Sequence, residues 1–176
     1  MTAEVKKATF ALDYEGKALD FSHLEPMDLA CPTQARPNGV RINVRFSCHC
    51  FTEAYDAAKH DGRPMMMDRG KQRAFCPARF ELSQQLPDLI RSLPDAHVYM
   101  TPEANFVRLA LNEDVEYRMY FNVRRFAESG YDLQIFVESA YRPDTPGLPP
   151  EKMQKVRFKV LVDKVLTNQK LKFHRR

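Results

Sequence analysis

The sequence predicts a single α+β domain built on an antiparallel β-sheet of about five or six strands, with two or three packed helices. Two observations carry this prediction. Between Asn105 and Arg142, three runs rich in β-branched and aromatic residues follow one another across short turn-forming segments, which is typical of an antiparallel meander. Helical spacing of apolar residues occurs before and after this region, and that order favours an α+β arrangement.

The middle run of the predicted meander, from Val115 to Arg125, alternates strictly between two kinds of side chain. Successive side chains of a strand point to opposite faces, so one face is expected to be core and the other polar. The core face would carry Tyr117, Met119, Phe121 and Val123, and the polar face Arg118, Tyr120, Asn122 and Arg124. A row of donors and aromatic rings is unusual for a plain solvent surface, so this polar row is the first candidate for a binding site.

The remaining elements follow from local patterns and turn signals. The sequence predicts a β-hairpin over 8–21 with its turn at Glu15-Gly16, a proline-rich loop over 23–39, a strand over 40–51, a helix over 53–60, a mobile loop over 63–73, a helix over 83–93 and a strand over 97–100. Prolines at 143, 146, 149 and 150 indicate a linker, 143–150, leading to a basic C-terminal helix. Apolar residues from Phe158 to Leu166 recur at helical spacing, although the alternation that begins at Val156 leaves a strand open there.

Composition is that of an ordinary globular protein, with 44% hydrophobic and 28% charged residues in 176. No apolar run approaches the roughly 18 residues of a membrane span. The N-terminus lacks the apolar region of a signal peptide, so we expect a cytoplasmic protein whose cysteines stay reduced.

The net charge of +4 is unevenly distributed. Residues 1–31 hold three Lys against six acidic residues, whereas residues 151–176 hold nine Lys and Arg against two acidic residues. Such a basic C-terminal region either contacts a polyanion or is simply a solvated helix face with a frayed end.

The cysteines allow two interpretations. Cys31, Cys48, Cys50 and Cys76 could supply a tetrahedral zinc site. The Cys48-His49-Cys50 spacing lacks the two to four intervening residues of a zinc knuckle, and in a strand His49 would point away from both thiols. We therefore expect buried thiols, with no metal and no cofactor.

Strand 40–51 places a second polar row beside the first. Arg41, Arg45 and His49 share one face of this strand. The two cations would lower the pKa of His49 and keep the imidazole neutral, which suits a general base. The alternative is a half-exposed strand histidine without a role.

The two polar rows would converge if they lie on the same side of the sheet. Guanidinium groups bind phosphate and aromatic rings stack on unpaired bases, so the combination suits a nucleic acid. The expected contacts are Arg41, Arg45, Asn122 and Arg124, extended by Tyr141 and Arg142 at the end of the last meander strand. The alternative is that these side chains lie over a solvated sheet face.

Three segments, Phe106-Val-Arg-Leu, Tyr117-Arg-Met-Tyr-Phe-Asn-Val and Leu133-Gln-Ile-Phe-Val-Glu-Ser-Ala-Tyr-Arg, lie in a region, 82–142, that resembles the core of the RelE/BrnT-type ribonuclease toxins. The resemblance implies metal-independent cleavage of RNA by side chains on the sheet, and an antitoxin as protein partner. His49 or Tyr120 would act as general acid or base, while Arg118 stabilises the developing charge on the phosphate. The alternative is a non-catalytic module of a mobile element or phage-defence system that binds nucleic acid or protein.

Overall fold

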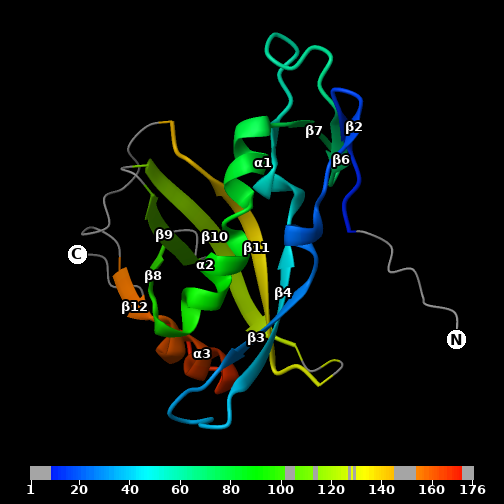
Figure 1. Cartoon of the computed structure of the whole chain (residues 1–176). Coiled ribbons are helices and arrows are strands. Elements are labelled where there is room, and N and C mark those ends of the chain that lie inside the picture. Colours follow the sequence, from blue (N-terminus) through cyan, green and yellow to red (C-terminus); the bar gives the residue numbers. More distant parts are fainter. Residues whose placement is uncertain are drawn as a thin grey trace, which may run out of the picture.

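The computed structural model describes residues 9–101, 106–112, 115–126, 128, 130–144 and 154–171. Within these residues the chain forms a seven-stranded sheet, a three-stranded sheet and a two-stranded hairpin, together with three α-helices (Figure 1). The predicted α+β class is confirmed. No helix of the described part of the chain has the length and apolar character needed to cross a membrane.

The large sheet places the predicted meander at its centre. Its strands lie in the order β12 (Gln154–Arg157), β8 (His97–Met100), β9 (Phe106–Asn112), β10 (Val115–Arg125), β11 (Leu133–Tyr141), β4 (Val40–Phe46) and β3 (Met27–Cys31). All neighbours pair antiparallel except β11 and β4, which are parallel. β3 was not predicted, because the prolines on either side of it indicated a continuous loop. β12 occupies the start of the predicted C-terminal helix.

One face of this sheet forms the core. Buried side chains of β4, β10 and β11, among them Ile42, Met119 and Ile135, meet α2 (Leu86–Ser92) and α3 (Phe158–Leu166) (Figure 1). The Phe158 ring of α3 lies 6.3 Å from the Phe121 ring of β10, centroid to centroid. Burying side chains of this size contributes about 1.5–3 kcal/mol each. The other face of β4, β10 and β11 therefore carries the polar residues of the alternating pattern.

The smaller sheet replaces two predicted elements. β5 (Thr52–Ala54) pairs with β7 (Lys71–Phe75), which pairs with β6 (Met65–Asp68). The predicted helix over 53–60 is wrong, because pairing with β7 holds the chain extended at its start. The predicted mobile loop over 63–73 is also wrong. Arg69 and Gly70 both have positive φ, 48° and 77°, the geometry of a two-residue hairpin turn.

The N-terminal hairpin was predicted correctly. β1 (Asp13–Tyr14) and β2 (Lys17–Ala18) pair around Glu15 and Gly16, whose φ angles are 50° and 74°. A 3-10 turn, η1 (Ser22–Leu24), follows and leads into β3.

The strand predicted over 40–51 ends earlier. β4 stops at Phe46, and the chain turns into the 3-10 helix η2 (Cys48–Cys50). The Ser47 side chain accepts a hydrogen bond from the backbone N–H of His49, and Ser47 donates its own backbone N–H to Val137. This capped turn takes His49 off the polar side of the sheet.

The helix predicted over 83–93 is divided. α1 (Pro77–Ser83) ends at Ser83, the residue predicted to start the helix, and α2 begins after Gln84 and Gln85. A final 3-10 turn, η3 (Leu93–Asp95), leads toward β8. The predicted C-terminal helix exists as α3, from Phe158. Most of the predicted proline-rich linker, 145–150, and the end of the basic region, 172–176, lie outside the described residues.

Candidate functional site

The polar side chains of β4, β10 and β11 lie on the same side of the sheet. The strand register pairs Gln134 with Asn43 on one side and with Arg124 on the other. The Gln134 amide nitrogen donates to Asn43 Oδ1 at 3.2 Å, and Arg124 Nε donates to Gln134 Oε1 at 3.0 Å. The surface formed by Arg41, Asn43, Arg45, Asn122, Arg124 and Gln134 is called the polar sheet face below. The structure therefore brings together the two arginine rows expected from the sequence.

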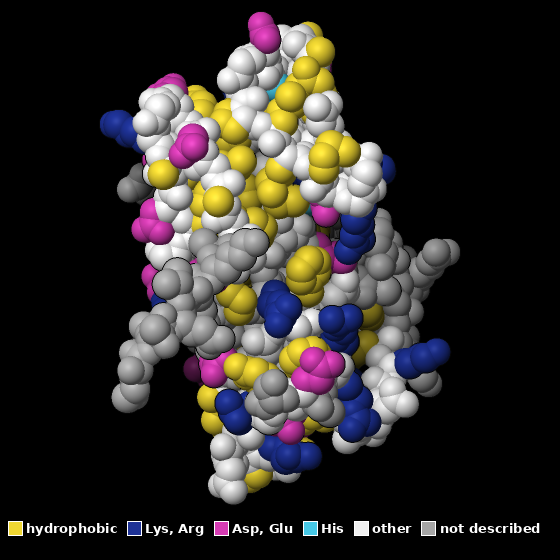
Figure 2. Space-filling view, turned by 90° about the vertical axis from the view of Figure 1, so that its right-hand side faces the viewer, with side chains coloured by type: hydrophobic (Ala, Val, Ile, Leu, Met, Phe, Trp, Pro, Cys, Tyr) yellow, Lys and Arg dark blue, Asp and Glu magenta, His cyan; other side chains and the backbone are white. Residues whose placement is uncertain are grey.

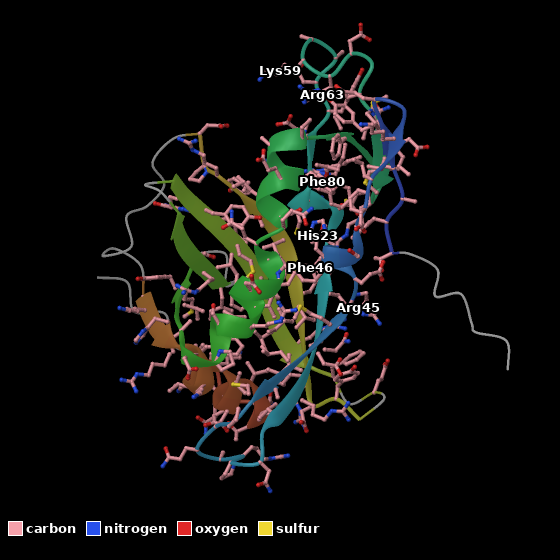
Figure 3. The ribbon with its side chains drawn as sticks, viewed as in Figure 1. His23, Arg45, Phe46, Lys59, Arg63 and Phe80 are labelled. Carbon is pink, nitrogen blue, oxygen red and sulfur yellow. The ribbon has the colours of Figure 1, made fainter. Side chains whose placement is uncertain are left out.

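Two buried amides hold Arg45 and Arg124 of the polar sheet face. Asn43 and Gln134 are 7% and 3% exposed, whereas Arg45 and Arg124 are exposed. Asn43 Oδ1 also accepts from Arg45 Nε at 3.2 Å, and Gln134 Oε1 accepts a second bond from Arg124 Nη2 at 2.5 Å. Amide oxygens are neutral acceptors, so they orient a guanidinium without cancelling its charge. Arg45 extends away from α1 and α2 (Figure 3).

Two carboxylates on this side accept hydrogen bonds from neutral donors. Asn122 donates to Glu138 Oε1 at 2.5 Å, and the Tyr131 hydroxyl donates to Asp28 Oδ1 at 2.5 Å. The hydrogen bond with Asp28 is the main cause that raises the pKa of Tyr131. The Arg41 guanidinium lies 5.1 Å from the centroid of the Tyr131 ring.

Positive side chains dominate the surface near β3 and β4. Figure 2 shows Lys and Arg gathered over the lower half of this side of the molecule. Hydrophobic side chains gather over the upper half. Arg142, also expected to contact nucleic acid, is exposed just beyond the end of β11.

A stack of two tyrosines and one arginine extends the polar sheet face toward α1. The rings of Tyr120 and Tyr141 lie 5.5 Å apart with an interplanar angle of 19°. The guanidinium of Arg79, from α1, lies 4.8 Å from the centroid of the Tyr141 ring. The register of β10 and β11 shifts between Tyr120 and Phe121, which leaves Glu138 as an extra residue in β11. Burial is the main cause that raises the pKa of Tyr141.

Arg118 differs from the other arginines of its row. It is 4% exposed and forms an ion pair with Glu116. Burial lowers the pKa of Arg118, but hydrogen bonds with Glu116 and Tyr120 outweigh burial and raise it. The expectation that Arg118 lies on an open face is therefore wrong, because its neighbours cover the guanidinium and a carboxylate neutralises it. Arg118 instead supports the tyrosine stack through its contact with Tyr120.

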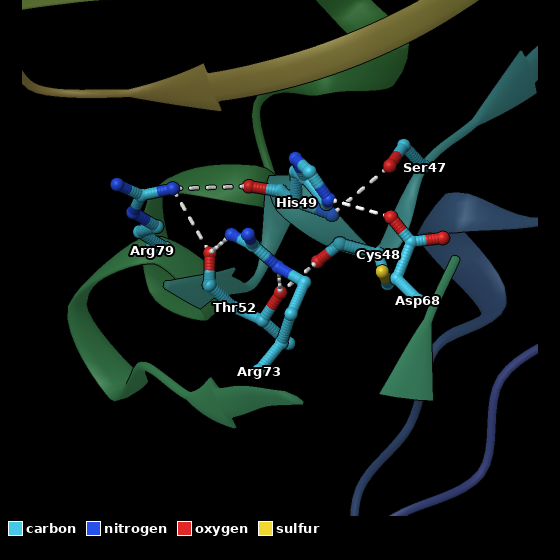
Figure 4. Close-up of polar contacts among 7 residues, drawn as sticks. All are labelled: Ser47, Cys48, His49, Thr52, Asp68, Arg73 and Arg79. Carbon is cyan, nitrogen blue, oxygen red and sulfur yellow. Dashed lines mark hydrogen bonds and ion pairs between the residues drawn. The ribbon is translucent and has the colours of Figure 1, made fainter. Parts of the chain in front are cut away.

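His49 belongs to a separate group of residues, which also contains Ser47, Cys48, Thr52, Asp68, Arg73 and Arg79 and is called the His49 cluster below (Figure 4). His49 Nε2 and Asp68 Oδ2 are 2.8 Å apart, joining η2 to β6. Arg79 Nη1 donates to the carbonyl oxygens of His49 and Thr52 at 3.3 and 2.9 Å. His49 therefore does not share a face with Arg41 and Arg45, as the predicted strand had placed it.

The His49 cluster keeps its imidazole neutral. Burial lowers the pKa of His49, and the charges of Arg73 and Arg79 lower it further, while the hydrogen bond with Asp68 acts against them. The expected direction is confirmed, but the cations are not Arg41 and Arg45. A carboxylate only accepts, so Nε2 carries the ring proton and Nδ1 keeps a lone pair. The His49 side chain is 33% exposed, so a ligand in solvent can reach this imidazole, which Asp68 orients.

The four cysteines do not meet as a zinc tetrad. Cys31, Cys48 and Cys50 are buried and Cys76 is half-buried, and all four are free thiols. Burial raises the pKa of Cys31 to about 11 and also raises the pKa of Cys48 and Cys50. The predicted buried thiols are confirmed for Cys31, Cys48 and Cys50, whereas Cys76 is only half-buried. Cys48 instead lies beside His49 and Asp68, with one possible ligand atom of each within 4.8 Å of the others.

Sequence reasoning missed three members of the His49 cluster, Asp68, Arg73 and Arg79. The first two lie in the segment predicted to be a loop, and Arg79 lies in a helix that was not predicted. One signal was present. Met65–Asp68 and Lys71–Phe75 flank Arg69-Gly70, and a two-residue segment ending in Gly between extended runs indicates a hairpin.

Comparison with known proteins replaces the resemblance drawn from the sequence. A family model described as the YjaZ family matches residues 11–166. The chain is 26% identical over 139 residues to Protein YjaZ of Escherichia coli (strain K12), covering 77% of this chain and 75% of that protein. No solved structure matches. The resemblance to RelE/BrnT-type toxins is therefore wrong, since the match spans nearly the whole chain whereas the resemblance rested on one meander, and the antitoxin partner loses its basis.

Proposed function

We propose that in this chain, which belongs to the YjaZ family, the polar sheet face binds single-stranded nucleic acid in the bacterial cytoplasm. The observation that carries the proposal is the placing of Arg45 and Arg124 on the buried amides of Asn43 and Gln134. The free thiols support a reducing compartment.

The charge that Arg45 and Arg124 offer to a ligand depends on which groups hold each guanidinium. A carboxylate partner would cancel the charge of Arg45 or Arg124 before a ligand arrived. The amides leave the charge in place, and each guanidinium keeps N–H donors for a phosphate oxygen. Since the side chains are already oriented, less conformational entropy is lost when they bind. Arg41 adds a third exposed cation on the same face.

The tyrosine stack supplies the second half of the argument. Tyr120 and Tyr141 are partly exposed, and the Arg79 guanidinium lies over the Tyr141 ring. An aromatic side chain contributes about 1–3 kcal/mol per stacked base and accepts any base. Bases are available for such stacking in a single strand but not within a duplex, so the proposed ligand is single-stranded.

The test is the salt dependence of binding to a fluorescein-labelled single-stranded RNA oligonucleotide, measured by anisotropy. The variant Arg45→Gln/Arg124→Gln should bind more weakly, and the slope of log affinity against log salt should become shallower by about 0.7 per lost phosphate contact. Arg91→Gln is the matched control, because Arg91 is an exposed arginine on α2 beneath the other face. Wild-type protein without affinity, or equal slopes in both variants, would contradict the proposal.

Acid–base cleavage of RNA at His49 is a second candidate function. Asp68 orients the neutral imidazole, and Arg79 contacts both the His49 carbonyl and the Tyr141 ring. A base next to the tyrosine stack would be placed beside a bound strand. Nδ1 would take the proton of a 2′-hydroxyl, whose oxygen attacks the adjacent phosphorus and displaces the 5′-oxygen. That oxygen then takes up a proton from the imidazolium.

The cleavage candidate predicts products ending in a 2′,3′-cyclic phosphate when the protein is incubated with RNA in the presence of EDTA. His49→Ala should reduce the rate by about 10²–10⁴-fold. His97→Ala is the control, since His97 lies on β8, which β9, β10 and β11 separate from β4 in the sheet. Full activity of His49→Ala would exclude His49 as the base. The binding proposal would not be affected, because the salt dependence tests it separately.

A further inference from the structure

We propose that Cys48, His49 and Asp68 form a binding site for a divalent transition metal ion, with zinc as the best match. One possible ligand atom from each residue lies within 4.8 Å of the others. No second group of three such residues comes together in the described ranges. The site does not depend on the polar sheet face, so the metal proposal and the binding proposal can fail separately. A bound ion would occupy His49, so the cleavage candidate applies only to the metal-free protein.

The chemistry of the three donors selects the ion. A thiolate, an imidazole and a carboxylate are ligands of zinc, while magnesium and calcium prefer oxygen alone. Three protein ligands with a fourth position open to water is the arrangement of reactive zinc sites rather than structural ones. Cys48 is 7% exposed, whereas the His49 and Asp68 side chains are about one third exposed, so solvent reaches the site from their side.

Two elements hold these ligands in place. Cys48 and His49 belong to η2, where the Ser47 side chain caps the turn and the Thr52 hydroxyl donates to the Cys48 carbonyl at 2.8 Å. Asp68 is the last residue of β6, directly before the turn that joins β6 to β7. The ligands are therefore fixed by backbone geometry before an ion arrives, which lowers the entropy cost of binding it.

Binding requires one small movement and the loss of one proton. Two ligand atoms about 2.0–2.1 Å from a tetrahedral zinc stand roughly 3.3 Å apart, so the 2.8 Å contact between His49 and Asp68 must widen slightly. If the ion takes the place of the proton on Nε2, that proton moves to Nδ1. The Cys48 thiol loses its proton to solvent as the sulfur–metal bond forms.

The charges around the site oppose binding only moderately. The ion brings two positive charges and one proton leaves, so the cluster gains one positive charge in total. Arg73 and Arg79 repel that added charge, while the Asp68 carboxylate attracts it.

Titration of the tag-free protein with Co²⁺ tests the site directly. Wild-type protein should bind one ion and develop both a thiolate-to-cobalt charge-transfer band in the near ultraviolet and the intense visible bands of tetrahedral cobalt. Zn²⁺ should displace the cobalt and abolish both. Cys48→Ser should lose the charge-transfer band, and Asp68→Asn should weaken binding by more than the roughly 10–100-fold that loss of an outer partner causes.

Cys76→Ser is the matched control, because Cys76 is a half-buried thiol outside the cluster, and it should keep the spectrum. Arg45→Gln/Arg124→Gln should also keep it. The Asp68→Asn variant should fold normally, since Asp68 is partly exposed and Asn has its shape. Misfolding would therefore not explain its weaker cobalt binding. A wild-type titration without a charge-transfer band, or a Cys48→Ser spectrum equal to that of wild type, would overturn the proposal.

Discussion

Tyr120 and Tyr141 stack almost in parallel across β10 and β11, with ring centroids 5.5 Å apart and an interplanar angle of 19°. At this separation and angle the rings are offset, which is a favourable arrangement for two aromatic side chains. The guanidinium of Arg79 rests against the Tyr141 ring, and Arg118 contacts Tyr120 from below the surface. Contacts within the protein therefore hold the stack in this geometry before any ligand binds.

Replacing Tyr141 by Ala should weaken nucleic-acid binding without changing its salt dependence. The expected loss is about 1–3 kcal/mol, because the aromatic stack that a base would join loses one of its two rings while every phosphate contact remains. Tyr141→Phe keeps the ring and should keep the affinity. Anisotropy titrations at three salt concentrations separate the two effects. A shallower salt slope for Tyr141→Ala would show that the tyrosine acts through charge and not through stacking.

Protonation of His49 should lower the free energy of unfolding as the pH falls. Its pKa is lower in the folded protein than the ordinary value of 6.5, so the unfolded chain binds more protons in this range. The stability it contributes is present above pH 6.5 and is lost as the pH falls toward the folded pKa. Urea unfolding at pH 5, 6 and 7 should show a smaller change in midpoint for His49→Gln than for wild type. An equal or larger change in the variant would contradict this assignment.

Removing the carboxylate of Glu116 should destabilise the fold. Glu116→Gln leaves the buried guanidinium of Arg118 without its counter-charge, and we expect a loss of about 3 kcal/mol, at the low end for buried pairs because Glu116 is one third exposed. Asp88→Asn breaks the exposed pair with Arg91 and should cost at most about 0.5 kcal/mol. Denaturant unfolding of both variants measures the difference. Equal losses would mean that the pair is solvated.

The docking of α3 should depend on one aromatic side chain. Phe158→Ala removes a fully buried ring and should lower the free energy of unfolding by about 3–5 kcal/mol. Val160→Ala on the same helix changes a residue that is 43% exposed and should cost less than about 0.5 kcal/mol. A small effect of Phe158→Ala would show that α3 is not part of the core.

The meander was predictable because alternation in Val115–Arg125 is a local property that the structure keeps. Tyr117, Met119 and Phe121 are buried as expected, and the polar rows of β4 and β10 share one side. The shared side could not be derived from either strand alone, because it depends on the parallel pairing of β4 with β11, two segments far apart in sequence.

The His49 cluster was not predictable for a similar reason. The strand pattern continues through Cys48 and Cys50, but the backbone turns at Ser47, whose side chain caps a new turn. His49 then meets Asp68 on β6, 19 residues along the chain. Local propensity cannot show which distant hairpin will receive a side chain.

The most direct measurement of the central proposal is a backbone amide NMR titration of the protein with a single-stranded oligonucleotide. The account predicts that shifts concentrate on β4, β10 and β11, at Arg45, Arg124 and Tyr141, while the amides of α2 stay unchanged. Shifts confined to β12 and α3, in the basic C-terminal region, or no shifts at all, would contradict it.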